Sequence, residues 1–184
     1  MNTVMHKTMN LHTDTIREIN LENQHLIIDE LDSMCDQSLL DNDLNNKEKL
    51  ATNGIVDGQI VYRSYDYSLD DNKTLTKLLN DQQIFPTNYL CSLLYGQDGN
   101  YKPHSDKHRL LSIMYLKTDE VSTTNFYKSK IGSKKGFYEF DEVELFEEKV
   151  IERNKLYLFN HQTVHSVTNV YKLRCNISIN LSNI

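Results

Sequence analysis

The sequence predicts a mainly β protein of the α+β class, in which a β-barrel or double-sheet jelly roll is flanked by helices. Two observations predict this architecture. Residues 16–34 carry apolar side chains at a mostly helical spacing. From residue 88 onward, short apolar segments alternate with turn-forming residues, which is typical of successive β-strands. We therefore expect a helical N-terminal third followed by a β core.

The N-terminal part of the chain is expected to support that core. Ser68-Leu69-Asp70-Asp71 precedes a run of leucines, which indicates a short helix with a polar cap at its start. The expected elements are, in order, an irregular start (1–14), a helix (16–34), an Asn- and Asp-rich loop with a short helix (38–58), a strand (59–65) and the capped helix (68–79).

The C-terminal part is expected to be almost entirely β. The predicted strands are 89–95, 110–116, 123–127, 137–140, 144–146, 155–159 and 173–181. A length of 184 residues suits one domain with one core. We therefore expect a single domain over 1–184, with a support region at 1–88 and a jelly-roll catalytic core at 89–184.

Composition excludes several classes of protein. The formal net charge of -6 argues against a general nucleic-acid binder, which is more often basic. The sequence has no apolar run as long as a membrane span, so a cytoplasmic protein is expected. Its three cysteines, Cys35, Cys91 and Cys175, are far apart and form no CxxC pair. We expect reduced thiols rather than a disulfide framework or a structural zinc site.

A candidate metal site is formed by His104-Ser105-Asp106 together with His165. Two imidazoles and one carboxylate are the ligands of a facial triad, which holds non-haem Fe(II) and leaves positions open for oxygen chemistry. Side chains at i and i+2 of a strand end point to the same face. The alternatives are a surface His104, a turn residue Asp106 and a core His165. His161 lies near His165, but a three-ligand site needs no fourth ligand.

Arg174 opens the last predicted strand, nine residues after His165. An unpaired arginine inside a dry barrel would be costly, whereas its fork of donors suits a bound carboxylate. An ordinary ion pair with an internal Asp or Glu is the alternative. Asn176, two residues later, is expected to face the same side.

Residues 89–181 resemble the Fe(II)/2-oxoglutarate-dependent dioxygenases, in particular the prolyl-hydroxylase-like branch. The resemblance lies in a strand that ends in Tyr95, a Gly-containing turn leading to His104-Ser105-Asp106, the apolar strand 156–159, His165 and Arg174. It implies a cupin-like double-stranded β-helix. The Gly-Gly often found in the middle strand of this family is absent from Ser122-Thr123-Thr124, which weakens assignment to one subfamily.

The resemblance also implies a role for each site residue. His104, Asp106 and His165 would bind Fe(II), and Arg174 would pair with the C5 carboxylate of 2-oxoglutarate. Tyr115 would donate a hydrogen bond to the same carboxylate and Tyr95 would line the pocket, although both tyrosines could equally be core aromatics. The reaction would consume O2 and 2-oxoglutarate, with ascorbate as a further candidate cofactor. It would hydroxylate an unactivated C–H bond and release succinate and CO2.

The expected primary substrate is a peptide or an amino-acid-like small molecule. Residues that could line its site are Arg63, Tyr101, Arg109 and Asn176. The basic, Gly-containing segment 128–137 could be a lid, but a solvated hairpin tip is the favoured interpretation.

Other functions stay open at this point. A non-catalytic cupin-like metal-binding or structural protein would not need Arg174. A zinc hydrolase with the same three ligands would normally need a catalytic Glu close to the metal, and the sequence has no HExxH motif. A nucleic-acid-directed 2-oxoglutarate oxygenase would carry a second arginine further along the chain, which is absent.

Overall fold

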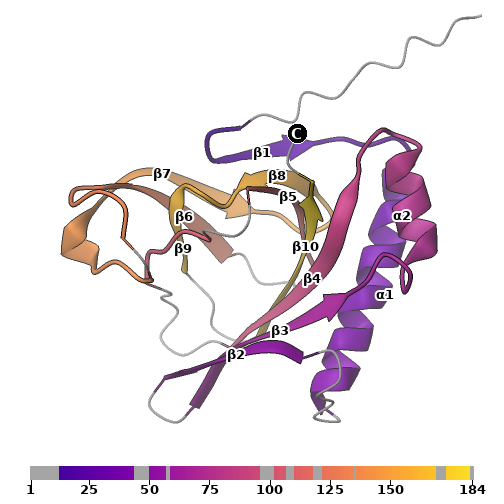
Figure 1. The fold of residues 1–184 in the computed structure, drawn as a ribbon, viewed down its shortest axis with the longest axis horizontal. Helices are drawn as coiled ribbons and strands as arrows, with labels where there is room; N and C mark the ends of the chain where they lie inside the picture. Colours follow the sequence, from indigo (N-terminus) through magenta and orange to yellow (C-terminus); the bar gives the residue numbers. More distant parts are fainter. Residues whose placement is uncertain are drawn as a thin grey trace, which may run out of the picture.

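Two antiparallel β-sheets pack against each other, and two helices cover the outer face of the larger sheet (Figure 1). The structure is a computed structural model. It describes residues 13–43, 50–56, 59–95, 102–106, 110–117, 122–134, 136–168 and 173–182, without the side chains of 51–61. Among the described residues, no helix is long and apolar enough to cross a membrane.

The larger sheet contains strands from both halves of the chain. Its order is β1 (Ile16–Ile19), β8 (Leu156–Asn160), β5 (Leu111–Leu116), β10 (Leu173–Leu181), β4 (Pro86–Tyr95), β3 (Gln59–Tyr67) and β2 (Leu50–Val56). The smaller sheet has the order β7 (Val143–Ile151), β6 (Ser122–Ser129) and β9 (Val164–Thr168). In both sheets, many strands that lie side by side are far apart in the sequence, as expected for a jelly roll.

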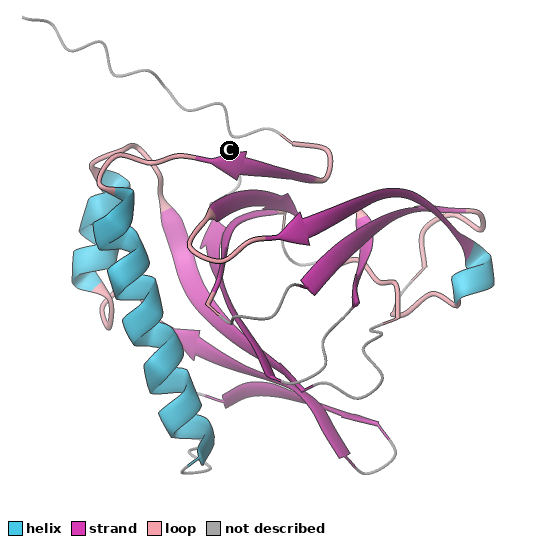
Figure 2. Cartoon of the chain, turned by 180° about the vertical axis from the view of Figure 1, so that it is seen from behind, coloured by secondary structure: helices cyan, strands magenta, loops and turns pink. Residues whose placement is uncertain are grey.

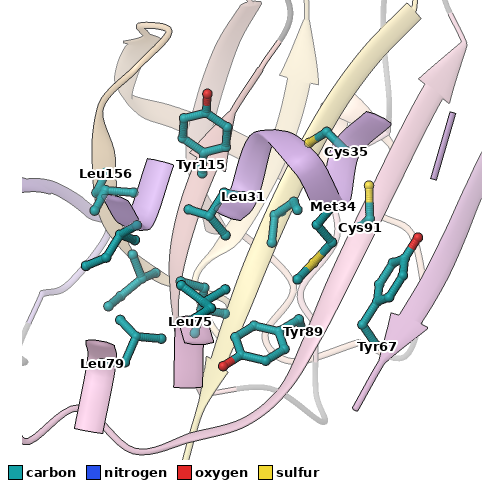
Figure 3. Packing of buried hydrophobic residues seen from close by; sticks show 14 of the residues in the cluster. Leu31, Met34, Cys35, Tyr67, Leu75, Leu79, Tyr89, Cys91, Tyr115 and Leu156 are labelled. Atoms are coloured by element: carbon teal, nitrogen blue, oxygen red, sulfur yellow. The ribbon is translucent and has the colours of Figure 1, made fainter. Parts of the chain in front are cut away.

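Helix α1 (Gln24–Asp43) lies across the outer face of the larger sheet beside α2 (Lys73–Asn80), as Figure 2 shows from behind. The buried residues of α1 recur at intervals of three and four, which places them on one stripe: Ile27, Leu31, Met34, Cys35, Ser38 and Asp41. They pack on apolar side chains of the sheet and of α2 (Figure 3). This cluster is the main core.

Strand β10 separates that core from a polar interior. Its outward residues Cys175, Ile177 and Ile179 are fully buried beneath α1. The alternate residues Arg174 and Asn176 face the space between the two sheets, because successive side chains of a strand point to opposite faces. A second apolar cluster fills part of this space: Ile16, Met114, Leu116, Phe126, Ile151, Tyr157 and Phe159.

The expected mainly β fold is confirmed, but the helical N-terminal third is only partly right. Residues 16–19 form strand β1, and the helix begins at Gln24 and continues to Asp43. The spacing of Ile16 and Ile19 fits a helix as well as a short edge strand. These residues form a strand because residues 16–19 pair with β8. Asn23, with φ 52°, turns the chain between the two elements.

Three further differences concern short elements. Residues 50–56, expected to be loop, form β2, and residues 164–168 form β9. The expected strand 137–140 is a single bridge at Phe137 followed by a 3-10 turn, Phe140–Glu142. The short helix after Ser68 is present as α2, but the expected polar cap is not: the N-cap residue is Asn72, whose side chain makes no cap hydrogen bond. The side chains of Ser68 and Asp71 each accept a hydrogen bond from the other's backbone N–H, which closes a turn before the helix begins.

Candidate metal centre

His104 and His165 are joined through their backbones. The N–H of His104 donates to the carbonyl of His165 over 2.9 Å, and the N–H of His165 donates back over 2.8 Å. This isolated bridge fastens the segment 102–106 to β9. The potential ligand atoms of His104, Asp106 and His165 all lie within 4.8 Å of one another. The three side chains expected to bind a metal are therefore brought together. His104 and Asp106 lie on a loop rather than on a strand, and the loop is bridged at His104 to both Phe137 and His165.

The two imidazoles are oriented by backbone carbonyls. Nδ1 of His104 lies 3.0 Å from the carbonyl of Lys102, and Nδ1 of His165 lies 2.8 Å from the carbonyl of Thr163. A carbonyl only accepts, so in both rings Nδ1 carries the proton. In the neutral form of each ring the lone pair is then on Nε2, and Nε2 of His104 lies 3.8 Å from Oδ1 of Asp106. This is the tautomer that a metal ligand requires.

Asp106 is held by His161. Oδ2 of Asp106 accepts a hydrogen bond of 2.8 Å from Nδ1 of His161, while Nε2 of His161 lies 2.7 Å from the hydroxyl of Ser112. Burial opposes ionisation of Asp106, but the His161 hydrogen bond and the surrounding imidazoles hold the pKa of the carboxyl well below its usual range. His161 is thus a buried side chain that positions the carboxylate and leaves Oδ1 available.

His165 is kept neutral by its surroundings. Its ring is buried, and burial together with the nearby His104 lowers its pKa to about 3. At neutral pH His165 therefore offers a neutral nitrogen and Asp106 a negative oxygen, beside the imidazole of His104. This donor set fits a divalent first-row metal such as Fe(II).

Arg174 lies in the interior that the two sheets enclose. It is 3% exposed and reaches from β10 to the smaller sheet, where Nε donates to the hydroxyl of Ser122 over 2.9 Å. Nη1 donates to Oδ1 of Asn176 over 2.8 Å, and Nη2 lies 4.0 Å from the sulfur of Met114. Asn176 thus shares the face of Arg174, as the strand alternation predicts.

Strand β6 connects the surroundings of Arg174 with those of the histidines. Ser122, which contacts Arg174, and Phe126, which pairs with His165, lie on the same face of β6. They are about 13 Å apart along the strand at ~3.3 Å per residue. Thr124 lies midway between them, and its buried hydroxyl has no hydrogen-bond partner among the described residues. Buried hydroxyls are normally bonded, so a polar group bound between the two sites would satisfy Thr124.

Tyr115, expected beside Arg174, lies on the opposite face of the sheet. In the strand register Tyr115 pairs with Ile177, whereas Leu116 pairs with Asn176. Its hydroxyl donates to Oδ1 of Asp32 on α1 over 2.6 Å. Met114, the residue before Tyr115, points into the interior beside Arg174 instead. The prediction that Tyr115 contacts the co-substrate is therefore wrong, because neighbouring residues of a strand point to opposite faces.

Tyr95 and Arg63 also point toward α1. The Tyr95 hydroxyl donates to Oδ1 of Asn42 over 2.6 Å, and Nη1 of Arg63 donates to the same oxygen over 2.7 Å. The sheet backbone separates both side chains from the interior face of Arg174. The structure therefore does not bring them to the candidate site. Arg109 and Tyr101 lie outside the described residues.

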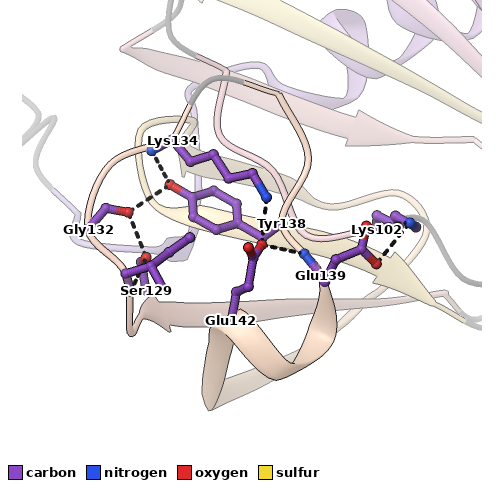
Figure 4. A network of polar contacts seen from close by, with 8 residues as sticks. Lys102, Ser129, Gly132, Lys134, Tyr138, Glu139 and Glu142 are labelled. Carbon is purple, nitrogen blue, oxygen red and sulfur yellow. Dashed lines mark hydrogen bonds and ion pairs between the residues drawn. The ribbon is translucent and has the colours of Figure 1, made fainter.

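The basic segment 128–137 carries an internal network of polar contacts (Figure 4). The Tyr138 hydroxyl donates to the carbonyl of Gly132 and accepts from the N–H of Lys134, whose ammonium pairs with Glu142 at 2.6 Å. Lys102 pairs with Glu139 at 2.7 Å on the other side of the turn. The positive charges of Lys134 and Lys102 are thus used within the protein.

Phe137 is a residue that the sequence did not single out. Its ring packs edge-on against the imidazole of His104, with 5.4 Å between ring centroids, and remains 57% exposed. The backbone of the neighbouring Tyr138 donates to the carbonyl of Pro103 over 2.7 Å. The hairpin between β6 and β7 therefore forms one wall beside the metal ligands. Pairing between 137 and 104 has no local sequence signal, so it was not expected.

The comparisons with known proteins concern the fold. No protein-family model matches the sequence, and no curated protein matches it by sequence. Two similar solved structures are a prolyl hydroxylase from Trichoplax adhaerens in complex with a hypoxia inducible factor peptide fragment, and AviO1 from Streptomyces viridochromogenes. The first has a TM-score of 0.55 and 13% identity, and the match covers 93% of this chain and 84% of that one. AviO1 has a TM-score of 0.55 and 10% identity, with 92% and 90% covered. At these identities the likeness shows that the chain has the fold of these proteins.

Proposed function

We propose that this protein is an Fe(II)- and 2-oxoglutarate-dependent oxygenase. His104, Asp106 and His165 would hold the metal, and Arg174 would bind the distal carboxylate of 2-oxoglutarate. The observation that carries the proposal is that the metal ligands and Arg174 lie near opposite ends of one face of β6. Thr124 lies between them on that strand, and its hydroxyl has no hydrogen-bond partner among the described residues. The prolyl-hydroxylase-like fold supports the same interpretation.

The bound metal and 2-oxoglutarate would supply oxygen activation and C–H hydroxylation, with succinate and CO2 as co-products. The chain's own residues contribute position and charge. The carbonyls of Lys102 and Thr163 accept from Nδ1 of the two histidines, so that Nε2 of each ring is the nitrogen that would bind the metal, and His161 keeps one oxygen of Asp106 occupied. Ser122 and Asn176 hold the guanidinium of Arg174, so its orientation is fixed before a carboxylate binds.

The substrate that we propose is an amino-acid residue of a peptide or an amino-acid-like small molecule. Two observations favour this class. The exposed ring of Phe137 beside His104 offers apolar contact at the metal ligands. The similar prolyl hydroxylase was solved with a peptide fragment bound. Lys102 and Lys134 are both paired with carboxylates, so their charges do not favour a strongly acidic substrate.

An anaerobic titration tests the metal and co-substrate sites. Fe(II) and 2-oxoglutarate added together should give a visible metal-to-ligand charge-transfer band at one equivalent per chain. Arg174→Ala should weaken 2-oxoglutarate binding by about 10-fold or more, because a charge-assisted contact is lost. Arg63→Ala is the matched control, since Arg63 lies on the outer face of the same sheet and should bind as the wild type does.

The outcomes separate the candidate functions. Absence of the band in the wild-type protein would exclude the oxygenase. A band without succinate release under O2, with any of a panel of peptides and amino acids, would favour a binding protein with the same metal centre. Equal 2-oxoglutarate affinity in the wild type and Arg174→Ala would remove Arg174 from the co-substrate site.

A further inference from the structure

The three cysteines of the chain meet at one point of the main core. Cys35 comes from α1, Cys91 from β4 and Cys175 from β10, and all three side chains are fully buried. Their sulfur atoms lie within 4.8 Å of one another, and the sulfurs of Cys91 and Cys175 are 3.6 Å apart. Figure 3 shows the side chains of Cys35 and Cys91 between the helix and the sheet.

This convergence is not what isolated buried cysteines produce. A buried cysteine ordinarily behaves as a small apolar side chain, and its position in a core has no relation to other cysteines. Here three cysteines that are distant in the sequence, on three different elements, turn their sulfurs toward one another although the core holds many apolar residues they could contact. The spacing of the three cysteines in the sequence matches no known cysteine motif, so it does not predict that they meet.

The distances match a ligand set around one ion. With metal–sulfur bonds of about 2.3 Å, sulfurs in a tetrahedral or planar trigonal arrangement lie about 3.8–4.0 Å apart. The observed separations, from 3.6 Å to at most 4.8 Å, surround these values. Small side-chain rotations would therefore bring all three sulfurs to one ion without moving the strands.

The electrostatics favour an ion of low charge. All three cysteines are fully buried in the main core, away from solvent. One thiolate balances one positive charge, whereas an ion of higher charge would need more thiolates in a dry core.

We propose that Cys35, Cys91 and Cys175 form a binding site for one soft monovalent metal ion, of which Cu(I) is the representative. Sulfur ligands select Cu(I), and an ion that accepts three ligands needs no fourth group. Structural zinc is almost always four-coordinate, and this cluster offers three ligands among the described residues. Binding leaves the ion as Cu(I), and each sulfur that binds as a thiolate releases its proton to solvent.

The site is separate from the candidate iron centre. Cys175 lies next to Arg174, but the two side chains point to opposite faces of β10, so the sheet divides them. Failure of the oxygenase proposal would leave this one unaffected. A variant with both His104→Ala and His165→Ala keeps the cysteines and removes both imidazole ligands of the other candidate centre.

The test is an anaerobic titration of the reduced protein with Cu(I) against a chromogenic Cu(I) chelator, followed to equilibrium because the sulfurs are buried. We expect one Cu(I) per chain and a near-ultraviolet sulfur-to-copper band. Each single Cys→Ala variant should weaken the affinity by about 100-fold or more, because a ligand is lost. Met34→Leu, a buried thioether on the same helix, and the double histidine variant should bind as the wild type does.

Two results would overturn the proposal. The chelator could remove all Cu(I) from the wild type, or the cysteine variants could bind as tightly as the wild type. If an alanine variant fails to fold, X-ray absorption of the copper-loaded wild-type protein decides instead. A first shell of sulfur alone supports the site, and nitrogen or oxygen ligands contradict it.

Discussion

Nδ1 of His161 donates a hydrogen bond of 2.8 Å to Oδ2 of Asp106, the carboxylate of the candidate metal centre. The ring is itself held by Ser112 through Nε2, over 2.7 Å. His161 therefore fixes which carboxylate oxygen faces the metal, although it offers no free nitrogen to the ion. Its importance for metal affinity can be separated from that of the ligands.

Replacing His161 by alanine should weaken Fe(II) or Co(II) binding by about 10- to 100-fold, the usual cost of losing a group that orients a ligand. The measurement is a metal titration of the purified protein under anaerobic conditions. His25→Ala is the control, because His25 lies exposed on α1 away from the centre. An unchanged affinity in His161→Ala would show that Asp106 is positioned without it.

The stability of the metal-free protein should depend on pH through His165. Burial lowers the folded-state pKa of His165 to about 3 from its ordinary value of 6.5. Between pH 3 and pH 6.5, the unfolded chain therefore binds a proton at His165 that the folded chain does not bind. Protonation of the unfolded chain lowers the free energy of unfolding, so stability is highest above pH 6.5 and falls as the pH decreases toward 3. Asp106, with its lowered pKa, acts in the same direction at still lower pH.

Thermal unfolding at a series of pH values measures this dependence. The unfolding temperature of the wild type should fall between pH 6.5 and pH 4, and the fall should be smaller in His165→Gln, which cannot titrate. If the unfolding temperature falls equally with pH in the two proteins, other groups cause the sensitivity to acid.

Tyr115→Phe tests the face assigned to Tyr115. Loss of the hydroxyl removes its hydrogen bond to Asp32 and should lower the free energy of unfolding by about 1–2 kcal/mol. The affinity for 2-oxoglutarate should stay the same, because the ring lies under α1. Denaturant unfolding and the charge-transfer titration measure the two properties. A loss of 2-oxoglutarate affinity comparable to that of Arg174→Ala would show that Tyr115 contacts the co-substrate after all.

Phe137→Ala tests the wall beside His104 and rests on the proposed oxygenase function. The ring is 57% exposed, so the substitution should cost little stability, within about 1 kcal/mol. Formation of the Fe(II)–2-oxoglutarate complex should be unchanged, whereas KM for a hydroxylated substrate should rise several-fold, about 3- to 10-fold, because an apolar contact is lost. Phe140→Ala, which changes a ring of similar exposure that packs near Tyr127 instead, is the control. A KM that changes equally in both variants would argue against a specific substrate contact.

The sequence predicted the long strands of the core because their apolar runs are unambiguous. It also predicted which residues could ligate a metal, since His104, Asp106 and His165 share a chemistry that local pattern can suggest. It failed where partners are distant. Strand β1 and a helix share the spacing of Ile16 and Ile19, and only pairing with β8 distinguishes them.

The prediction that Tyr115 contacts the co-substrate was wrong for a different reason. Its strand was placed correctly, but which face a residue of a fully buried strand points to is set by register with neighbours. Both faces of β5 are buried, so the sequence of this strand has no polar side to mark the direction. The meeting of the three cysteines depends in the same way on how α1 crosses the sheet.

The backbone bridge between His104 and His165 has a consequence for how the centre assembles. Two ligands from distant parts of the chain are joined by a pair of main-chain hydrogen bonds that need no metal. The conformational entropy of bringing these ligands together is therefore lost when the protein folds, and not when an ion arrives. The fold itself sets the spacing of these two ligands, so exchange of one divalent ion for another should leave the surrounding strands in place.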